Sequence, residues 1–239
     1  MRAAERSVLI DGPYSRIRPL RQFDSVVFLA GSTGATFTVP LMRDLVLQWM
    51  TMTTTTGCVG GSDAGSGNTF LTPSRLPPAG AATVTRSIRF VWVVKERASA
   101  KNWFKRQFED VVRDVRRLQR EGHDVAVEIQ IYVTAADFTP PSPTLSSSSS
   151  SLTHSTITNE KSNSTDTTIQ LLPDHPDIRN LIYETAETAR GEMAVVVCGP
   201  ASLVQSARNA AADVSVERGV HKGTGAQGIY VHAEAFGYV

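Results

Sequence analysis

The sequence predicts an α/β domain built on a doubly wound parallel sheet of about five strands. Three observations lead to this prediction. Apolar runs of strand length alternate with segments that have the period of a helix. The strand-like runs are almost continuously apolar, which is typical of parallel strands covered on both faces. Two of these runs end in small turns that lead into helices, and in such sheets ligands bind beyond the carboxyl ends of the strands.

The first strand, turn and helix lie at Val26–Pro40, and we expect the rest of the chain to be organised around this segment. An apolar run with β-branched residues stops at a small-residue loop, Gly31–Thr36, which leads into an apolar helical pattern. Gly31 and Gly34 allow the backbone to approach a ligand closely, and the N-terminus of the helix offers free N–H groups to a phosphate. Many α/β proteins use the same kind of loop only to reverse the chain, so the loop alone does not decide for a nucleotide.

The elements that follow keep the alternation of an α/β fold. Between Trp103 and Glu121, apolar residues recur at steps of four, three, four and three, which indicates one buried face of a helix. The opposite face carries several arginines, which we interpret as solvated because acidic residues interrupt them. We expect further strands at Ile88–Val94, Val125–Val133, Ala194–Val197 and Ile229–Ala233, and further helices at Asp177–Ala189 and after Pro200.

Two polar tracts interrupt this pattern. Residues 51–87 are dominated by Thr, Gly, Ser and Pro, and residues 134–172 include a proline cluster and a serine homopolymer. Such a composition offers too little apolar surface to offset the entropy of ordering, so we expect two low-complexity insertions, with residues 139–168 disordered. The sequence therefore predicts one folded domain over residues 23–239, preceded by a connecting segment, residues 1–22.

Composition and charge argue against several functional classes. The 239 residues carry a formal net charge of +1, which disfavours nucleic acid as a partner. No apolar run approaches the roughly 20 residues that span a bilayer, and the charged start of the chain is unlike a secretory signal. The five histidines lack metal-ligand spacing and the two cysteines have different surroundings, so we expect no metal site. Hydrolysis is disfavoured because no Ser/His/Asp pattern stands out.

Five short motifs together carry a family resemblance. They are Asp11–Tyr14, Ala30–Pro40, Phe90–Val94 with Trp103 and Phe104, Val197–Pro200, and Glu234-x-Phe236. In order and spacing they resemble the NAD(P)H-binding, carboxyl-terminal domain of ferric-chelate reductases and NADPH oxidases, and the fungal ferric reductase transmembrane components look closest. The resemblance implies a ferredoxin reductase-like NAD(P)-binding fold. It also implies that the chain is a carboxyl-terminal piece, with residues 1–22 as the tail of a missing flavin-binding barrel and its connection.

The resemblance further implies a binding site for the dinucleotide. The loop would cradle it through Gly31, Ser32, Thr33, Gly34, Ala35 and Thr36, with the Thr36 hydroxyl available to the nicotinamide side. Ser32 stands where a second glycine is usual, and Asp174-His175-Pro176 replaces the Gly-Arg-Pro of the family, which removes one basic contact. We expect Lys95, helped by Arg97, to select NADPH by pairing with the 2'-phosphate, although Lys95 also fits a polar strand end.

At the nicotinamide end the resemblance implies three catalytic side chains. Cys198 would lie near the nicotinamide, Gly199 and Pro200 would shape the turn beneath it, and Phe236 or Tyr238 would cover the flavin ring. Glu234 belongs to the same motif and is counted among the cofactor contacts. From the residues alone, a small buried hydrophobe is the default interpretation of Cys198, whereas Phe236 and Tyr238 could equally close the core.

The function implied is that of a ferric-chelate reductase, in which hydride passes from NADPH to FAD and electrons pass by way of haem to ferric chelates, for iron uptake. The expected partners are the flavin-binding and transmembrane haem domains of a full-length protein in the plasma membrane, with this domain facing the cytoplasm. Two alternatives stay open: a truncated nucleotide-binding or structural remnant without turnover of its own, and an NADPH oxidase that produces superoxide.

Overall fold

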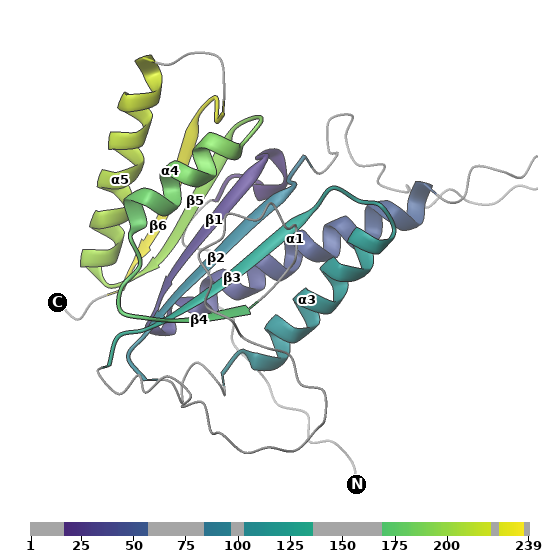
Figure 1. Cartoon of the computed structure of the whole chain (residues 1–239), viewed down its shortest axis with the longest axis horizontal. Coiled ribbons are helices and arrows are strands. Elements are labelled where there is room, and N and C mark those ends of the chain that lie inside the picture. Colours follow the sequence, from purple (N-terminus) through teal and green to yellow (C-terminus); the bar gives the residue numbers. More distant parts are fainter. Residues whose placement is uncertain (1–16, 57–83, 97–102, 136–168, 221–224, 237–239) are drawn as a thin grey trace, which may run out of the picture.

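A computed structural model describes residues 17–56, 84–96, 103–135, 169–220 and 225–236 (Figure 1). Its centre is a six-stranded sheet with the order β4-β3-β2-β1-β5-β6, in which every neighbouring pair is parallel. The strands are β1 (Ser25–Gly31), β2 (Ser87–Val94), β3 (Ala126–Val133), β4 (Ile169–Pro173), β5 (Met193–Gly199) and β6 (Ile229–Ala235). The helices are α1 (Ala35–Thr56), α3 (Lys105–Arg120), α4 (Ile178–Thr188) and α5 (Ala201–Val220), with short 3-10 turns η1 (Leu20–Gln22) and η2 (Ser32–Gly34).

The predicted doubly wound parallel sheet is confirmed, with six strands instead of about five. The additional strand is β4, which lies within the tract 134–172 that we expected to be an insertion. Helix α1 likewise continues to Thr56, beyond the predicted start of the first insertion at residue 51. The central parts of both tracts, residues 57–83 and 136–168, lie outside the described residues, as do Arg97, Tyr238 and the segment 1–16.

The two faces of the sheet are covered by different helix pairs, α1 with α3 on one face and α4 with α5 on the other (Figure 1). All seven residues of β1 are buried. Because side chains alternate along a strand, Val26 and Phe28 pack on the side of α1 and α3, whereas Val27 and Leu29 pack on the side of α4 and α5. Burial on both faces explains the almost continuous apolar runs in the sequence.

The strand order reverses beside β1. The chain builds β1, β2, β3 and β4 outward in sequence order, and then returns to place β5 on the other side of β1. The carboxyl ends of β1 and β5, at Gly31 and Gly199, therefore lie next to each other at the switch point. In open α/β sheets this is where ligands bind.

The opposite, amino-terminal end of the sheet is held by Asp24, which is 4% exposed. Its carboxylate accepts hydrogen bonds from the Arg86 guanidinium (Nε, 2.8 Å) and from the Arg190 backbone N–H (2.8 Å). Its backbone N–H donates to the Glu192 carbonyl, and its own carbonyl accepts from the Arg86 N–H, each at 2.8 Å. One buried residue thus joins the starts of β1, β2 and β5.

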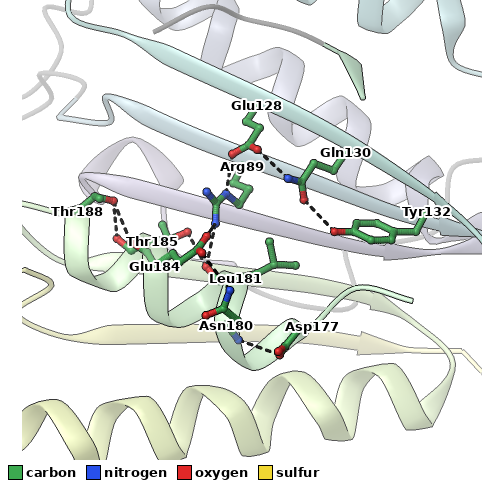
Figure 2. Close-up of polar contacts among 10 residues, drawn as sticks. All are labelled: Arg89, Glu128, Gln130, Tyr132, Asp177, Asn180, Leu181, Glu184, Thr185 and Thr188. Atoms are coloured by element: carbon green, nitrogen blue, oxygen red, sulfur yellow. Dashed lines mark hydrogen bonds and ion pairs between the residues drawn. The ribbon is translucent and has the colours of Figure 1, made fainter. Parts of the chain in front are cut away.

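A second set of polar contacts, centred on Arg89, holds α4 against the sheet (Figure 2). Arg89 of β2 donates to Glu128 of β3 (2.8 Å), to Glu184 of α4 (3.0 Å) and to the Leu181 carbonyl (3.3 Å). The Asp177 side chain caps the helix by accepting the Asn180 N–H at 3.0 Å. The cap marks where α4 begins, and the Arg89 contacts attach the helix to β2 and β3. The preceding residues 174–176 are thereby held at the end of the sheet.

We predict that Asp24→Ala costs about 3 kcal/mol of unfolding free energy, because it leaves the partly buried Arg86 and a backbone N–H without their acceptor. Asp124 is the matched control. It lies 4.0 Å from the same guanidinium but is 73% exposed, so Asp124→Ala should cost less than about 1 kcal/mol. Urea denaturation of both variants measures the difference, and equal losses would show that Asp24 does not hold the strand starts together.

Candidate functional site

The site lies where the turn between β1 and α1 touches the turn between β5 and α5. A Cβ atom placed on Gly31 would lie 2.7 Å from Cδ of Pro200, and one placed on Gly199 would lie 3.2 Å from the Cα of Gly31. A Cβ atom on Gly34 would overlap the carbonyl oxygen of Cys198 and lie 2.7 Å from its carbonyl carbon. A side chain at Gly34 would collide with backbone atoms and one at Gly31 with the Pro200 ring, while the contact at Gly199 is tight, so the packing of one turn on the other favours glycine at all three positions.

The first turn, predicted as the cradle, has a defined backbone shape. Ser32 has a φ of 48°, in the left-handed region that favours glycine, which explains why a glycine is usual at this position in the family that the sequence resembles. The Ser32 carbonyl accepts a hydrogen bond from Nε1 of the buried Trp92 at 2.8 Å. The exposed Thr36 hydroxyl donates to the Thr33 carbonyl at 2.8 Å. Hydrogen bonds within the protein therefore hold the loop in this shape.

A cleft of about 360 Å³ opens at the carboxyl ends of β1 and β2 and at the start of α5. Its volume is in the range of small-molecule sites. Four predicted residues line it: Gly31, Ser32, Lys95 and Pro200. The rest of the lining consists of Val93, Val94, Thr134, His175, Pro176, Ile178, Ser202, Leu203 and Ser206.

The chemistry of this lining suits an anion. Lys95 supplies a cation, and Ser202 and Ser206 supply hydroxyl donors from the first turns of α5. The N-terminus of α5 follows Pro200 directly, so its free N–H groups and the positive end of its dipole lie at the same edge. A phosphate-bearing ligand fits this combination of donors.

A second group of predicted residues lies at Gly34, at the ends of β5 and β6. Cys198 is 7% exposed and pairs in register with Glu234 of β6. Phe236 donates its backbone N–H to the Gly199 carbonyl at 3.1 Å, and a Cβ atom on Gly34 would lie 3.3 Å from its ring. Burial, and to a smaller extent the Glu234 carboxylate, raise the pKa of the Cys198 thiol, which keeps it protonated at neutral pH. The structure thus brings the three residues together.

The predicted site residues divide into two neighbouring groups. The cleft is lined by Gly31, Ser32, Lys95 and Pro200, whereas Cys198, Glu234 and Phe236 form the second group, which Gly34 contacts. The side chain of Ala35 is fully buried in the core. Sequence reasoning missed Ser202 and Ser206, although their place just after Gly199 and Pro200 at a helix start could have pointed to them.

Two kinds of site find no support in the described ranges. No group of three or more His, Cys, Asp and Glu side chains there could hold a metal ion. None of the helices in the same ranges has the length and apolar character needed to cross a membrane.

Comparison with known protein families decides the identity of the domain. A family model described as the ferric reductase NAD binding domain matches residues 23–212. This span runs from just before β1 into α5, so it includes both turns and the cleft. The chain belongs to this family. The resemblance drawn from the five motifs is confirmed, and the domain is an NAD(P)H-binding domain of an oxidoreductase family. A search of curated proteins found no match.

We predict that Gly34→Ala destabilises the ferric reductase NAD-binding domain by about 3 kcal/mol, because the added methyl group meets backbone atoms of Cys198 that cannot move without shifting β5. Gly228→Ala is the control, since its nearest neighbour would be Oε1 of Glu192 at 3.8 Å, an ordinary contact. That change should stay within about 1 kcal/mol of wild type. Thermal or urea denaturation of the pair checks the prediction, and a neutral Gly34→Ala would mean that the turns do not pack as described.

Proposed function

We propose that this chain is the NADPH-binding domain of a ferric-chelate reductase. In this proposal hydride passes from NADPH to an FAD held by a separate flavin-binding domain, and electrons then pass by way of haem to ferric chelates, which serves iron uptake at the plasma membrane. The observation that supports it best is a cleft lined by Lys95 and the start of α5 at the same edge of the sheet as Cys198, Glu234 and Phe236, in a chain that belongs to the ferric reductase NAD-binding family.

The residues of the cleft fit the phosphate-bearing half of a dinucleotide. Gly31 and Ser32 provide close backbone approach, the start of α5 provides N–H groups, and Lys95 provides the charge for a 2'-phosphate. Ser202 and Ser206 add hydroxyl donors. The cofactor, when bound, supplies the hydride, and the protein supplies binding and orientation.

The second group fits the nicotinamide end. Cys198 and Glu234 present a protonated thiol and a carboxylate at the ends of neighbouring strands. Phe236 is 38% exposed, so its ring is available to lie against a planar group. These side chains can exclude water and hold a ring in a fixed orientation, which affects the rate of hydride transfer more than affinity.

The test is a titration of the purified chain with NADPH under anaerobic conditions, followed by addition of a separately produced flavin-binding domain. We expect saturable binding and then bleaching of the flavin absorbance. Binding without flavin reduction would support the alternative of a remnant without turnover. In the assembled protein, superoxide in place of ferrous iron would support an NADPH oxidase.

Lys95 gives the proposal a sharper test. A charge-assisted contact to the 2'-phosphate contributes about 1.5 to 3 kcal/mol, so wild type should prefer NADPH over NADH by roughly tenfold to hundredfold. Lys95→Ala should bring the two dissociation constants close together, while Lys105→Ala, on an exposed part of α3 outside the cleft, should leave their ratio unchanged. An unchanged ratio in Lys95→Ala would remove Lys95 from the phosphate site.

A further inference from the structure

His232, which neither the sequence motifs nor the proposed function uses, lies beside the nicotinamide end. It belongs to β6, and its side chain is 9% exposed. Its Nε2 atom is 3.0 Å from Oε1 of Glu234. Because a carboxylate only accepts hydrogen bonds, Nε2 carries the proton of this bond. The imidazole therefore donates to Glu234.

The ring of His232 is held from a second side by α1. Phe37, the residue after Thr36 of the first turn, stacks on it with ring centroids 5.9 Å apart and an interplanar angle of 24°. Across the sheet, His232 pairs in register with the buried Val196 of β5. A ring fixed by packing and nearly excluded from water gives its hydrogen bond a defined direction.

Glu234 connects this histidine to the predicted catalytic thiol. Glu234 is half-exposed and lies in register with Cys198, and its charge is one of the two causes that raise the pKa of the thiol. A half-exposed glutamate can adopt rotamers that point into solvent. A hydrogen-bond donor such as His232 is therefore needed to keep the Glu234 carboxylate near Cys198.

We propose that His232 is a positioning residue that holds the Glu234 carboxylate against Cys198 at the nicotinamide end of the site. The inference rests on the proposed function for its purpose: a carboxylate fixed here stabilises the positive charge that develops on a nicotinamide ring as hydride leaves it. The arrangement itself, in which His232 acts on Cys198 through Glu234, can be tested without any cofactor.

The test uses the reactivity of Cys198 in the full chain. Cys58→Ser leaves Cys198 as the remaining cysteine of the sequence. The rate of alkylation by iodoacetamide is followed by intact mass between about pH 7 and pH 11.5, because the thiolate is the reactive form and burial raises the pKa of this thiol. The midpoint of the profile reports the pKa of the thiol, and the plateau at high pH reports its accessibility.

Four variants separate positioning from packing. Glu234→Gln removes the charge that helps to raise the pKa of the thiol, so the midpoint should fall and the rate below the midpoint should rise. His232→Phe keeps an aromatic ring against Phe37 but cannot donate, so Glu234 should swing to solvent and the midpoint should fall in the same direction. His232→Gln keeps a donor and should stay close to wild type. His232→Phe combined with Glu234→Gln should match Glu234→Gln alone.

His232 has titratable neighbours on its own strand and on β5. On the same face of the sheet, Glu234 and Tyr230 share the strand of His232 and Cys198 lies on β5, while α1 contributes the apolar Phe37. Tyr230→Phe removes a hydroxyl that accepts the Arg18 N–H at 3.3 Å, and it should leave the thiol profile unchanged. It controls for general loosening of β6.

Two results would overturn the proposal: an unchanged midpoint in His232→Phe, or an equal shift of that midpoint when Glu234 is already Gln. A change in the plateau alone would show a packing role and would also overturn it. NADPH titration of the same proteins keeps the two ideas apart. If the wild-type chain does not bind NADPH, the proposed function fails, whereas the thiol profiles still decide whether His232 acts through Glu234.

Discussion

The contact between the two glycine turns is the constraint on which the rest of the site depends. Gly34 lies so close to the backbone of Cys198 that no side chain fits there, and Gly31 packs tightly against Gly199 and Pro200. This contact sets where α1 and α5 leave the sheet, and so it sets the width of the cleft at the start of α5. The glycines serve the protein's own packing first, and the close backbone approach offered to a ligand is a consequence.

The strands that could be predicted from the sequence are those that helices cover on both faces of the sheet. The strands β1, β2, β3 and β5 have near-continuous apolar runs because helices cover both faces, and their positions were predicted within about two residues. The edge strand β4 was missed because its five residues are exposed or half-buried, so its apolar signal is weak, and a polar tract precedes it. Helix α1 was predicted too short because it ends in a run of threonines, which resembles a low-complexity tract.

The site could be predicted only in part, for a topological reason. Glycines at strand ends carry a local signal, and Lys95 and Pro200 follow strands directly, so the sequence placed them near the switch point. Ser202 and Ser206 carry only the weaker signal of their place at a helix start after Pro200, and His232 carries none, because histidine is unremarkable in an edge strand. The structure shows that these residues lie near the predicted site, because the strand order places β5 and β6 beside β1.

We propose that two tasks are divided between the cleft and the strand ends that Gly34 contacts. The cleft with Lys95 and the start of α5 suits phosphates, and the ends of β5 and β6, with Cys198 and Glu234, suit the reacting ring. The most direct test of this account is a titration of the isotopically labelled chain with NADP⁺, followed by amide NMR. The account predicts saturable shifts for residues 31–36, Lys95 and residues 199–206. Shifts confined to the surface between α1 and α3, or none at all, would contradict it.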